Sequence, residues 1–133
     1  NKGVTAKKLI IGLPYYGAQW LSKENIPGAR VASFIDHPPY KNIRKYHIDS
    51  SQTTINFDTL SASSYLIASQ KNGKFSQLFF EDSTSLALKY DWIKAQEFAG
   101  VGIWALGYDN GYSELWELLA EKFSVAATRK KTQ

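Results

Sequence analysis

The chain has 133 residues and a mass of 15.0 kDa, enough for one domain of ordinary size. Hydrophobic residues make up 44% and charged residues 21%, a globular composition that excludes a disordered chain, and the lack of cysteine excludes disulfides and thiolate chemistry. The net charge is +4, but no recognisable module combines basic and aromatic residues, so we expect no nucleic-acid partner.

The chain contains no methionine and begins Asn1-Lys2-Gly3. We therefore expect a processed product or a piece of a longer protein. The sequence contains neither an apolar run long enough for a membrane span nor a signal-peptide pattern. In a piece, these absences do not indicate where the parent protein acts. Residues 125–133 are expected to form a frayed basic tail.

The first predicted element is a strand over residues 8–13. Its residues Lys-Leu-Ile-Ile-Gly-Leu form a nearly continuous apolar run, which is typical of a strand buried on both faces of a parallel sheet. Pro14 and Gly17 end the run. We assign residues 1–20 to this strand and its loop.

Residues 21–82 are predicted to form an inserted, mostly irregular region. A short helix is expected near residues 40–47. Two apolar runs, Tyr65–Gln70 and Phe75–Phe80, then flank Asn72-Gly73, a pair that favours a type I′ turn because both of its positions need positive φ. This part of the chain therefore predicts a hairpin.

Residues 83–99 are predicted to form a helix, with Asp82 or Ser83 as its N-cap and Gly100 at its end. The main apolar stripe consists of Leu88, Trp92, Ala95 and Ala99, and Leu86, Tyr90 and Ile93 widen it.

A second continuous apolar run covers residues 101–106 and ends at Gly107. A last helix is expected over residues 113–123, with a buried face of Leu115, Leu118, Leu119 and Phe123. Residues 83–124 thus hold helix, strand and helix. The order of elements indicates an α/β fold with parallel strands. Two such strands cannot cover their own faces and edges, so we expect more sheet elsewhere.

Three segments carry a family resemblance. Residues 8–17 (KLIIGLPYYG), 80–90 (FEDSTSLALKY) and 100–109 (GVGIWALGYD) resemble, in this order and spacing, the seventh strand, the segment before the eighth strand and the eighth strand of family 18 (chitinase-like) glycoside hydrolases. The resemblance covers nearly all of residues 8–119, while the region between the first two segments aligns poorly.

This resemblance implies the C-terminal portion of a (β/α)8 TIM barrel, namely strands 7 and 8 with their helices, carrying a small inserted subdomain that contains the hairpin. A complete barrel needs about 250 residues and has its active site at the C-terminal ends of the strands.

The family implies substrate-assisted hydrolysis of β-1,4-linked N-acetylglucosamine polymers, such as chitin or peptidoglycan-like glycans. The family's catalytic string, Asp-x-x-Asp-x-Asp-x-Glu, does not occur in this sequence. We therefore name no catalytic residue and expect the fragment alone to be inactive. Asp82 is interpreted as a helix cap and Glu81 as a loop or rim residue, while Asp109 would anchor its loop and Glu114 and Glu117 decorate a helix start.

Substrate-binding residues are better represented. Trp104 matches the family's eighth-strand tryptophan, which forms the hydrophobic floor under the sugar, and Tyr16 matches its loop tyrosine, although a packed loop aromatic is equally compatible. Many members have arginine where this chain has Ala18, and Gln19 or Trp20 could partly substitute for it. His37 and His47 have no partners at metal-ligand spacing, so we expect neither a metal nor a cofactor.

Two rival interpretations stay open. One is a non-catalytic, lectin-like barrel that binds amino sugars with the same aromatic floor. The other is a free-standing interaction domain, which would have to cover its strand edges by self-association. For the leading interpretation, the partners are an N-acetylglucosamine-containing polysaccharide and the missing N-terminal part of the barrel, and the family implies an extracellular or cell-envelope location.

Overall fold

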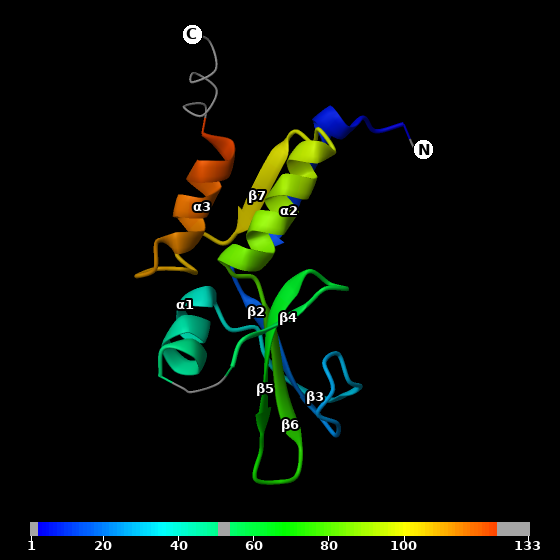
Figure 1. Ribbon diagram of the computed structural model, residues 1–133, viewed down its shortest axis with the longest axis vertical. Coiled ribbons are helices and arrows are strands. Elements are labelled where there is room, and N and C mark those ends of the chain that lie inside the picture. Colours follow the sequence, from blue (N-terminus) through cyan, green and yellow to red (C-terminus); the bar gives the residue numbers. More distant parts are fainter. Residues whose placement is uncertain (1–2, 51–53, 125–133) are drawn as a thin grey trace.

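The computed structural model describes residues 3–50 and 54–124, and the predicted basic tail at residues 125–133 lies outside these ranges. The chain forms a mixed α/β structure with one parallel strand pair and one antiparallel sheet (Figure 1). Its elements, in chain order, are η1 (Ala6–Lys8), β1 (Ile10–Pro14), β2 (Gly17–Ser22), β3 (Val31–Asp36), α1 (Tyr40–Ile43), η2 (Arg44–Ile48), β4 (Asn56–Asp58), β5 (Ser63–Ser69), β6 (Phe75–Phe80), α2 (Ser83–Ala95), β7 (Gly100–Trp104) and α3 (Glu114–Phe123). Within the described ranges, no helix has the length and apolar composition that crossing a membrane requires.

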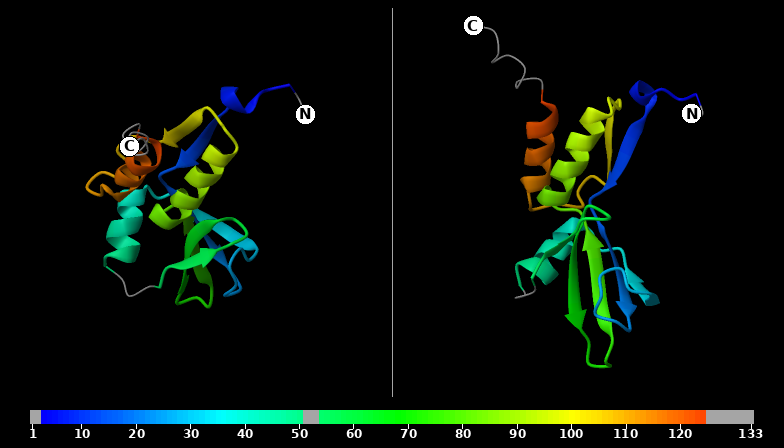
Figure 2. Two further views of the ribbon diagram at one scale, coloured as in Figure 1. Left: turned by 45° about the horizontal axis from the view of Figure 1, so that its top comes forward. Right: turned by 45° about the vertical axis from the view of Figure 1, so that its right-hand side comes forward.

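The parallel pair consists of β1 and β7, as the two apolar runs predicted. Their register runs from Ile10 opposite Gly100 to Pro14 opposite Trp104, so both strands end at the same edge. The helices α2 and α3 lie side by side over one face of the pair (Figure 2). The expected burial on both faces is wrong for this chain, because the opposite face, which includes Ile10, is exposed and no other described strand pairs with either edge.

The antiparallel sheet has five strands in the order β3-β2-β6-β5-β4. The predicted hairpin of β5 and β6 is confirmed, and so is a short helical segment formed by α1 and η2. The expectation of an otherwise irregular region is wrong, because β2, β3 and β4 are regular strands of this sheet. Residues 17–20 are predicted to belong to the first strand and its loop. They instead belong to β2 and pair with residues 77–80 of β6.

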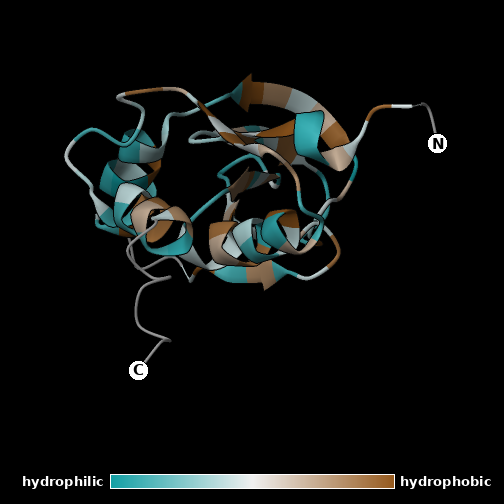
Figure 3. Cartoon of the chain, turned by 90° about the horizontal axis from the view of Figure 1, so that it is seen from above, coloured by the Kyte–Doolittle hydropathy of each residue, from teal (hydrophilic) through white to brown (hydrophobic). Residues whose placement is uncertain are grey.

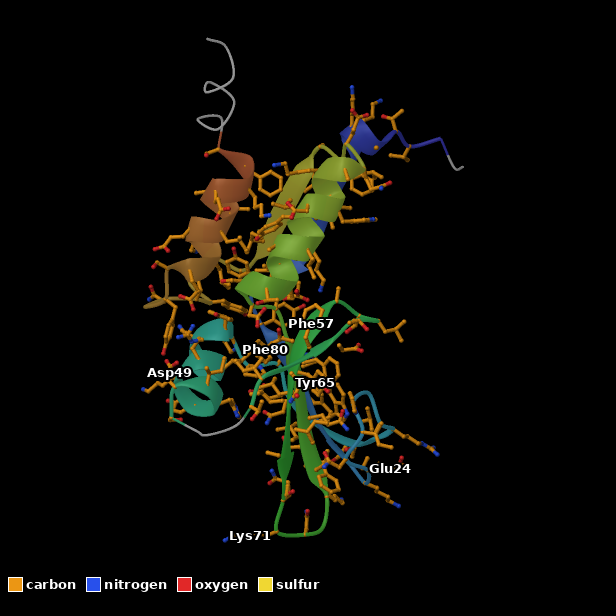
Figure 4. All side chains as sticks on the ribbon, viewed as in Figure 1. Glu24, Asp49, Phe57, Tyr65, Lys71 and Phe80 are labelled. Carbon is orange, nitrogen blue, oxygen red and sulfur yellow. The ribbon has the colours of Figure 1, made fainter. Side chains whose placement is uncertain are left out.

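The turn of the β5–β6 hairpin differs from the type I′ turn that Asn-Gly favours. Gly73 has a φ of +72°, whereas Asn72 is not among the residues with positive φ. Gly73 N donates to Gln70 O at 3.1 Å, and Gln70 N donates to Lys74 O at 2.8 Å. This pattern is a three-residue loop that ends in a left-handed glycine. Figure 4 shows Lys71 at the outer tip of this hairpin and Phe80 at its inner end.

Helix α2 begins where predicted, but the face that it buries in the core differs from the predicted one. Asp82 is the N-cap: its side chain accepts from Ser85 N at 2.9 Å, and the Ser85 hydroxyl accepts from Asp82 N at 2.9 Å. The helix ends at Ala95, before the expected Gly100. Leu88 and Trp92, expected in the main buried stripe, are 51% and 53% exposed, and the residues that widened the stripe are the ones that pack into the core: Leu86, Tyr90 and Ile93.

A single hydrophobic core joins the two sheets. Leu66, Leu78 and Phe80 come from the antiparallel sheet, Leu13 and Tyr15 from β1 and its end, and the rest from the helices: Tyr40, Ile43, Leu86, Tyr90, Ile93 and Leu115. The predicted α3 face is confirmed, because Leu115 is buried and Leu118, Leu119 and Phe123 pack against this core. Figure 3, which views the chain from above, shows hydrophilic and hydrophobic residues on different sides of the helices, as expected for amphipathic helices.

Candidate functional site

The C-terminal ends of β1 and β7 bring two predicted residues together. Pro14 and Trp104 are opposite each other in the last register position of the parallel pair, and Tyr15 N donates to Trp104 O at 2.7 Å. The peptide bond between Trp104 and Ala105 is cis. The chain leaves β1 into β2 and leaves β7 into the loop of residues 105–113, so side chains from both exits meet at this edge.

At this edge, four side chains line an open hollow of about 220 Å³: Tyr16, His37, Trp104 and Tyr108. The Tyr16 ring meets the Tyr108 ring edge to face, with centroids 6.3 Å apart, and meets the His37 ring in the same manner at 5.8 Å. Trp104 is 69% exposed, so its indole does not serve as core packing within the described chain. The hollow therefore presents aromatic surface to solvent, the surface that the C–H groups of a sugar favour.

His37 and Tyr108 were not predicted as site residues. His37 Nδ1 lies 3.1 Å from the carbonyl oxygen of Gly17. Because a carbonyl only accepts, Nδ1 carries the hydrogen, and Nε2 of the neutral ring is a hydrogen-bond acceptor. The sequence alone does not indicate a binding role for His37, because only the fold brings the end of β3 back to the beginning of β2.

Gln19 and Trp20 do not lie in this hollow. Gln19 Nε2 donates to the Ser76 hydroxyl at 2.9 Å, across the β2–β6 pair. Trp20 stacks on Phe79 with centroids 5.2 Å apart, and Phe79 in turn stacks on Tyr65 at 5.1 Å. Trp20 thus packs one face of its indole in this row, and it does not line the hollow.

The adjacent carboxylates Glu81 and Asp82 accept hydrogen bonds from different residues. Asp82 caps α2 as predicted and also accepts from the Ser64 hydroxyl at 2.6 Å. Glu81 was interpreted as a loop or rim residue, and it does lie in the loop between β6 and α2. It does not lie at an exposed rim, because the residue is only 6% exposed and its Oε1 accepts from Lys89 Nζ and from the Ser63 hydroxyl. Its Oε2 is buried without a hydrogen-bond partner among the described residues.

Two carboxylates of α3 accept hydrogen bonds, whereas the buried Asp109 has an oxygen without a partner among the described residues. Glu114 accepts from Arg44 and from the Tyr40 hydroxyl, and Glu117 accepts from the Ser113 hydroxyl. Asp109 is buried, and its Oδ2 has no partner in the described part of the chain. Burial raises the pKa of the Asp109 carboxyl. A group of three or more histidine and acidic side chains able to hold a metal does not occur within residues 3–50 and 54–124.

Comparisons with known proteins find a matching family model and similar sequences and structures. The family model described as glycosyl hydrolases family 18 matches residues 1–109. The chain is 27% identical over 121 residues to a cortical fragment-lytic enzyme of Bacillus anthracis, covering 90% of this chain and 26% of that enzyme. It is 27% identical over 141 residues to di-N-acetylchitobiase of Homo sapiens, covering 90% of this chain and 36% of that enzyme.

Among solved structures, a glycoside hydrolase family 18 N-acetylglucosaminidase from Paenibacillus barengoltzii superposes with a TM-score of 0.74 at 25% identity. That likeness covers 91% of this chain and 35% of the solved one. The chain thus spans about a quarter to a third of the length of these relatives.

Proposed function

Because the chain belongs to glycosyl hydrolase family 18, we propose that it forms the C-terminal part of a (β/α)8 barrel that hydrolyses β-1,4-linked N-acetylglucosamine polymers. In this proposal β1 and β7 are strands 7 and 8 of the barrel, and the segment from Gly17 to Phe80 is the inserted subdomain. The exposed face and open edges of the β1–β7 pair support it, because a buried parallel sheet needs further strands.

The observation that carries the proposal is the exposed indole of Trp104 beside Tyr16 at the C-terminal edge of the parallel pair. Barrel enzymes of this architecture hold their substrates at that edge. Trp104 would stack under one sugar ring, and the hydroxyl of Tyr16 or Nε2 of His37 would hydrogen-bond to sugar hydroxyls. Burial of the sugar's C–H surface on the indole would stabilise the bound ring.

The chain contributes binding surface and no acid in this proposal. Among the described carboxylates near the hollow, Asp82 caps a helix, and Glu81, Glu114 and Glu117 accept from cations or hydroxyls. Asp109 is buried and does not line the hollow, so none of these groups presents an acid to a sugar bound there. The general acid would come from the part of the barrel that this chain lacks. The names of the relatives also support an amino-sugar polymer, since they include a cortical fragment-lytic enzyme and a di-N-acetylchitobiase. A cell-envelope or extracellular place of action would follow.

The experiment starts with the source DNA upstream of Asn1. An in-frame Asp-x-x-Asp-x-Asp-x-Glu after an apolar run, together with cleavage of N-acetylglucosamine tetrasaccharide by the protein expressed from the whole reading frame, would support the proposal. Binding of the tetrasaccharide without cleavage would favour the lectin-like alternative. If the protein neither binds nor cleaves the tetrasaccharide, the proposal and the lectin-like alternative are both overturned.

A further inference from the structure

A second hollow lies next to the Trp104 hollow, and the two share Tyr16. Its volume is about 140 Å³. The residues that matter for its chemistry are Pro14, Tyr16, Ala18, Ser63, Phe79 and Glu81. Ala18 is opposite Phe79 in the β2–β6 register, so both side chains lie on the same face of the antiparallel sheet. The proposed function does not use this second hollow.

The walls of the second hollow are mostly apolar, and Glu81 is the charged residue among them. Oε1 of Glu81 is satisfied by Lys89 Nζ and the Ser63 hydroxyl, whereas Oε2 is buried and has no donor among the described residues. A buried carboxylate oxygen without a donor is unfavourable, and a ligand that brings a donor would relieve it.

The charge balance decides what kind of donor fits. Lys89 already compensates the charge of Glu81, and both side chains are largely buried. A cationic ligand would therefore add an uncompensated charge next to apolar walls, which is costly. A neutral N–H donor attached to a small apolar group suits both features of the hollow.

We propose that this second hollow is a subsite for the acetamido group of a sugar that neighbours the one on Trp104. The amide N–H donates to Glu81 Oε2, and the methyl group lies against Phe79 and Tyr16. Ala18 leaves the space that the group occupies. This inference rests on the proposed function, because it takes an N-acetylated glycan as the ligand, and it adds a site that selects acetylated over deacetylated sugars.

The experiment compares two tetrasaccharides, of N-acetylglucosamine and of glucosamine, by isothermal titration calorimetry with the protein expressed from its whole reading frame. In the variant Ala18→Leu the larger side chain fills the hollow. We expect its affinity for the acetylated tetrasaccharide to fall about fivefold or more, and its preference for acetylated over deacetylated sugar to shrink. The matched control is Ala68→Leu, at an exposed position of β5, which should leave both affinities unchanged.

A second measurement needs no variant. In the wild-type complex, NMR should show nuclear Overhauser effects between the acetyl methyl protons and the ring protons of Phe79. Absence of these contacts, or an Ala18→Leu variant with normal affinity and acetyl preference, would overturn the subsite.

Trp104→Ala separates the two hypotheses. If this variant weakens binding while Ala18→Leu does not, the subsite fails and the proposed function stands. If wild type binds neither tetrasaccharide, both fail.

Discussion

The guanidinium of Arg44 donates from Nη1 to Oε1 of Glu114 at 2.5 Å, and this contact joins η2 to the last described helix. Arg44 lies on η2 and Glu114 begins α3, which are 70 residues apart in the sequence. The Tyr40 hydroxyl donates to the same carboxylate oxygen at 2.8 Å, and the Arg44 guanidinium lies over the Tyr112 ring. The helical segment of α1 and η2 is thereby held against α3, which lies beside α2 over the parallel pair.

Replacing Arg44 by methionine should lower the free energy of unfolding. The side chains of Arg44 and Glu114 are about one-third exposed, so solvent screens the pair, and we expect a loss of about 1 kcal/mol. Urea unfolding followed by circular dichroism measures it. Arg30→Met is the matched control, because Arg30 is exposed and forms no ion pair with any described residue, and an equal loss in both variants would contradict the role of the pair.

Gly17→Ala should destabilise the antiparallel sheet. A Cβ at this position would lie 2.8 Å from both Leu78 Cδ1 and the Phe79 carbonyl oxygen, so β2 would have to move away from β6. We expect a loss of about 1–3 kcal/mol in urea unfolding. The control is Gly102→Ala on β7, whose Cβ would meet only Ile10 Cγ2 at 3.6 Å and should change stability by less than about 1 kcal/mol. Similar losses in the two variants would argue against the steric explanation.

Asp82→Ala should weaken the start of α2. The side chain accepts from Ser85 N and from the Ser64 hydroxyl, and both donors lose their acceptor in the variant. We expect a loss of about 1–2 kcal/mol in thermal and urea unfolding. Asp82→Asn keeps one acceptor oxygen and should therefore recover a large part of the lost stability. An asparagine variant as unstable as the alanine variant would show that capping is not the cause.

The stability of the protein should depend on pH through Asp109. Burial raises the pKa of this carboxyl, so the folded chain keeps a proton that the unfolded chain has already released. The stabilisation is fully present below the ordinary aspartate pKa of about 4 and is lost as the pH rises through the raised folded-state pKa. Asp109→Asn cannot titrate. Its stability relative to wild type should therefore increase from about pH 4 to pH 7 in urea unfolding, whereas parallel curves would mean that this carboxyl does not titrate differently in the two states.

Trp104→Ala should reduce sugar binding with little effect on folding. The indole is 69% exposed, so its removal takes little surface out of the core. We expect the affinity for N-acetylglucosamine tetrasaccharide to fall about tenfold or more, equivalent to about 1.4 kcal/mol. Trp92→Ala is the control, because Trp92 is also exposed but lies on α2 next to Phe98, away from the hollow. An equal loss of affinity in both variants would remove Trp104 from the site.

The sequence by itself determined the features that depend on local pattern. Two nearly continuous apolar runs predicted β1 and β7, and a polar residue before the helix, Asp82 or Ser83, predicted the cap of α2. The structure selects Asp82. The Asn-Gly pair predicted a hairpin, although the loop adopts another turn in which only Gly73 needs positive φ. The three motifs around Tyr16, Phe80 and Trp104 also indicated the family, which the family model confirms.

Only the tertiary structure decided which side chains are buried and which lie together. The periodic pattern of α2 does not show which face packs against the core, and core contacts bury Leu86, Tyr90 and Ile93. Glu81 can be buried because Lys89 and Ser63 donate to its carboxylate. The strand β2 pairs with β6 about 60 residues later, and that pairing carries Trp20 and Gln19 away from the hollow.

The hydrogen bond from His37 to the Gly17 carbonyl likewise joins segments 20 residues apart. His37 thereby lines the hollow with Tyr16 and Trp104, the two of the four predicted binding residues that lie there. Burial and proximity depend on long-range packing, and the local sequence pattern contains only the near neighbours.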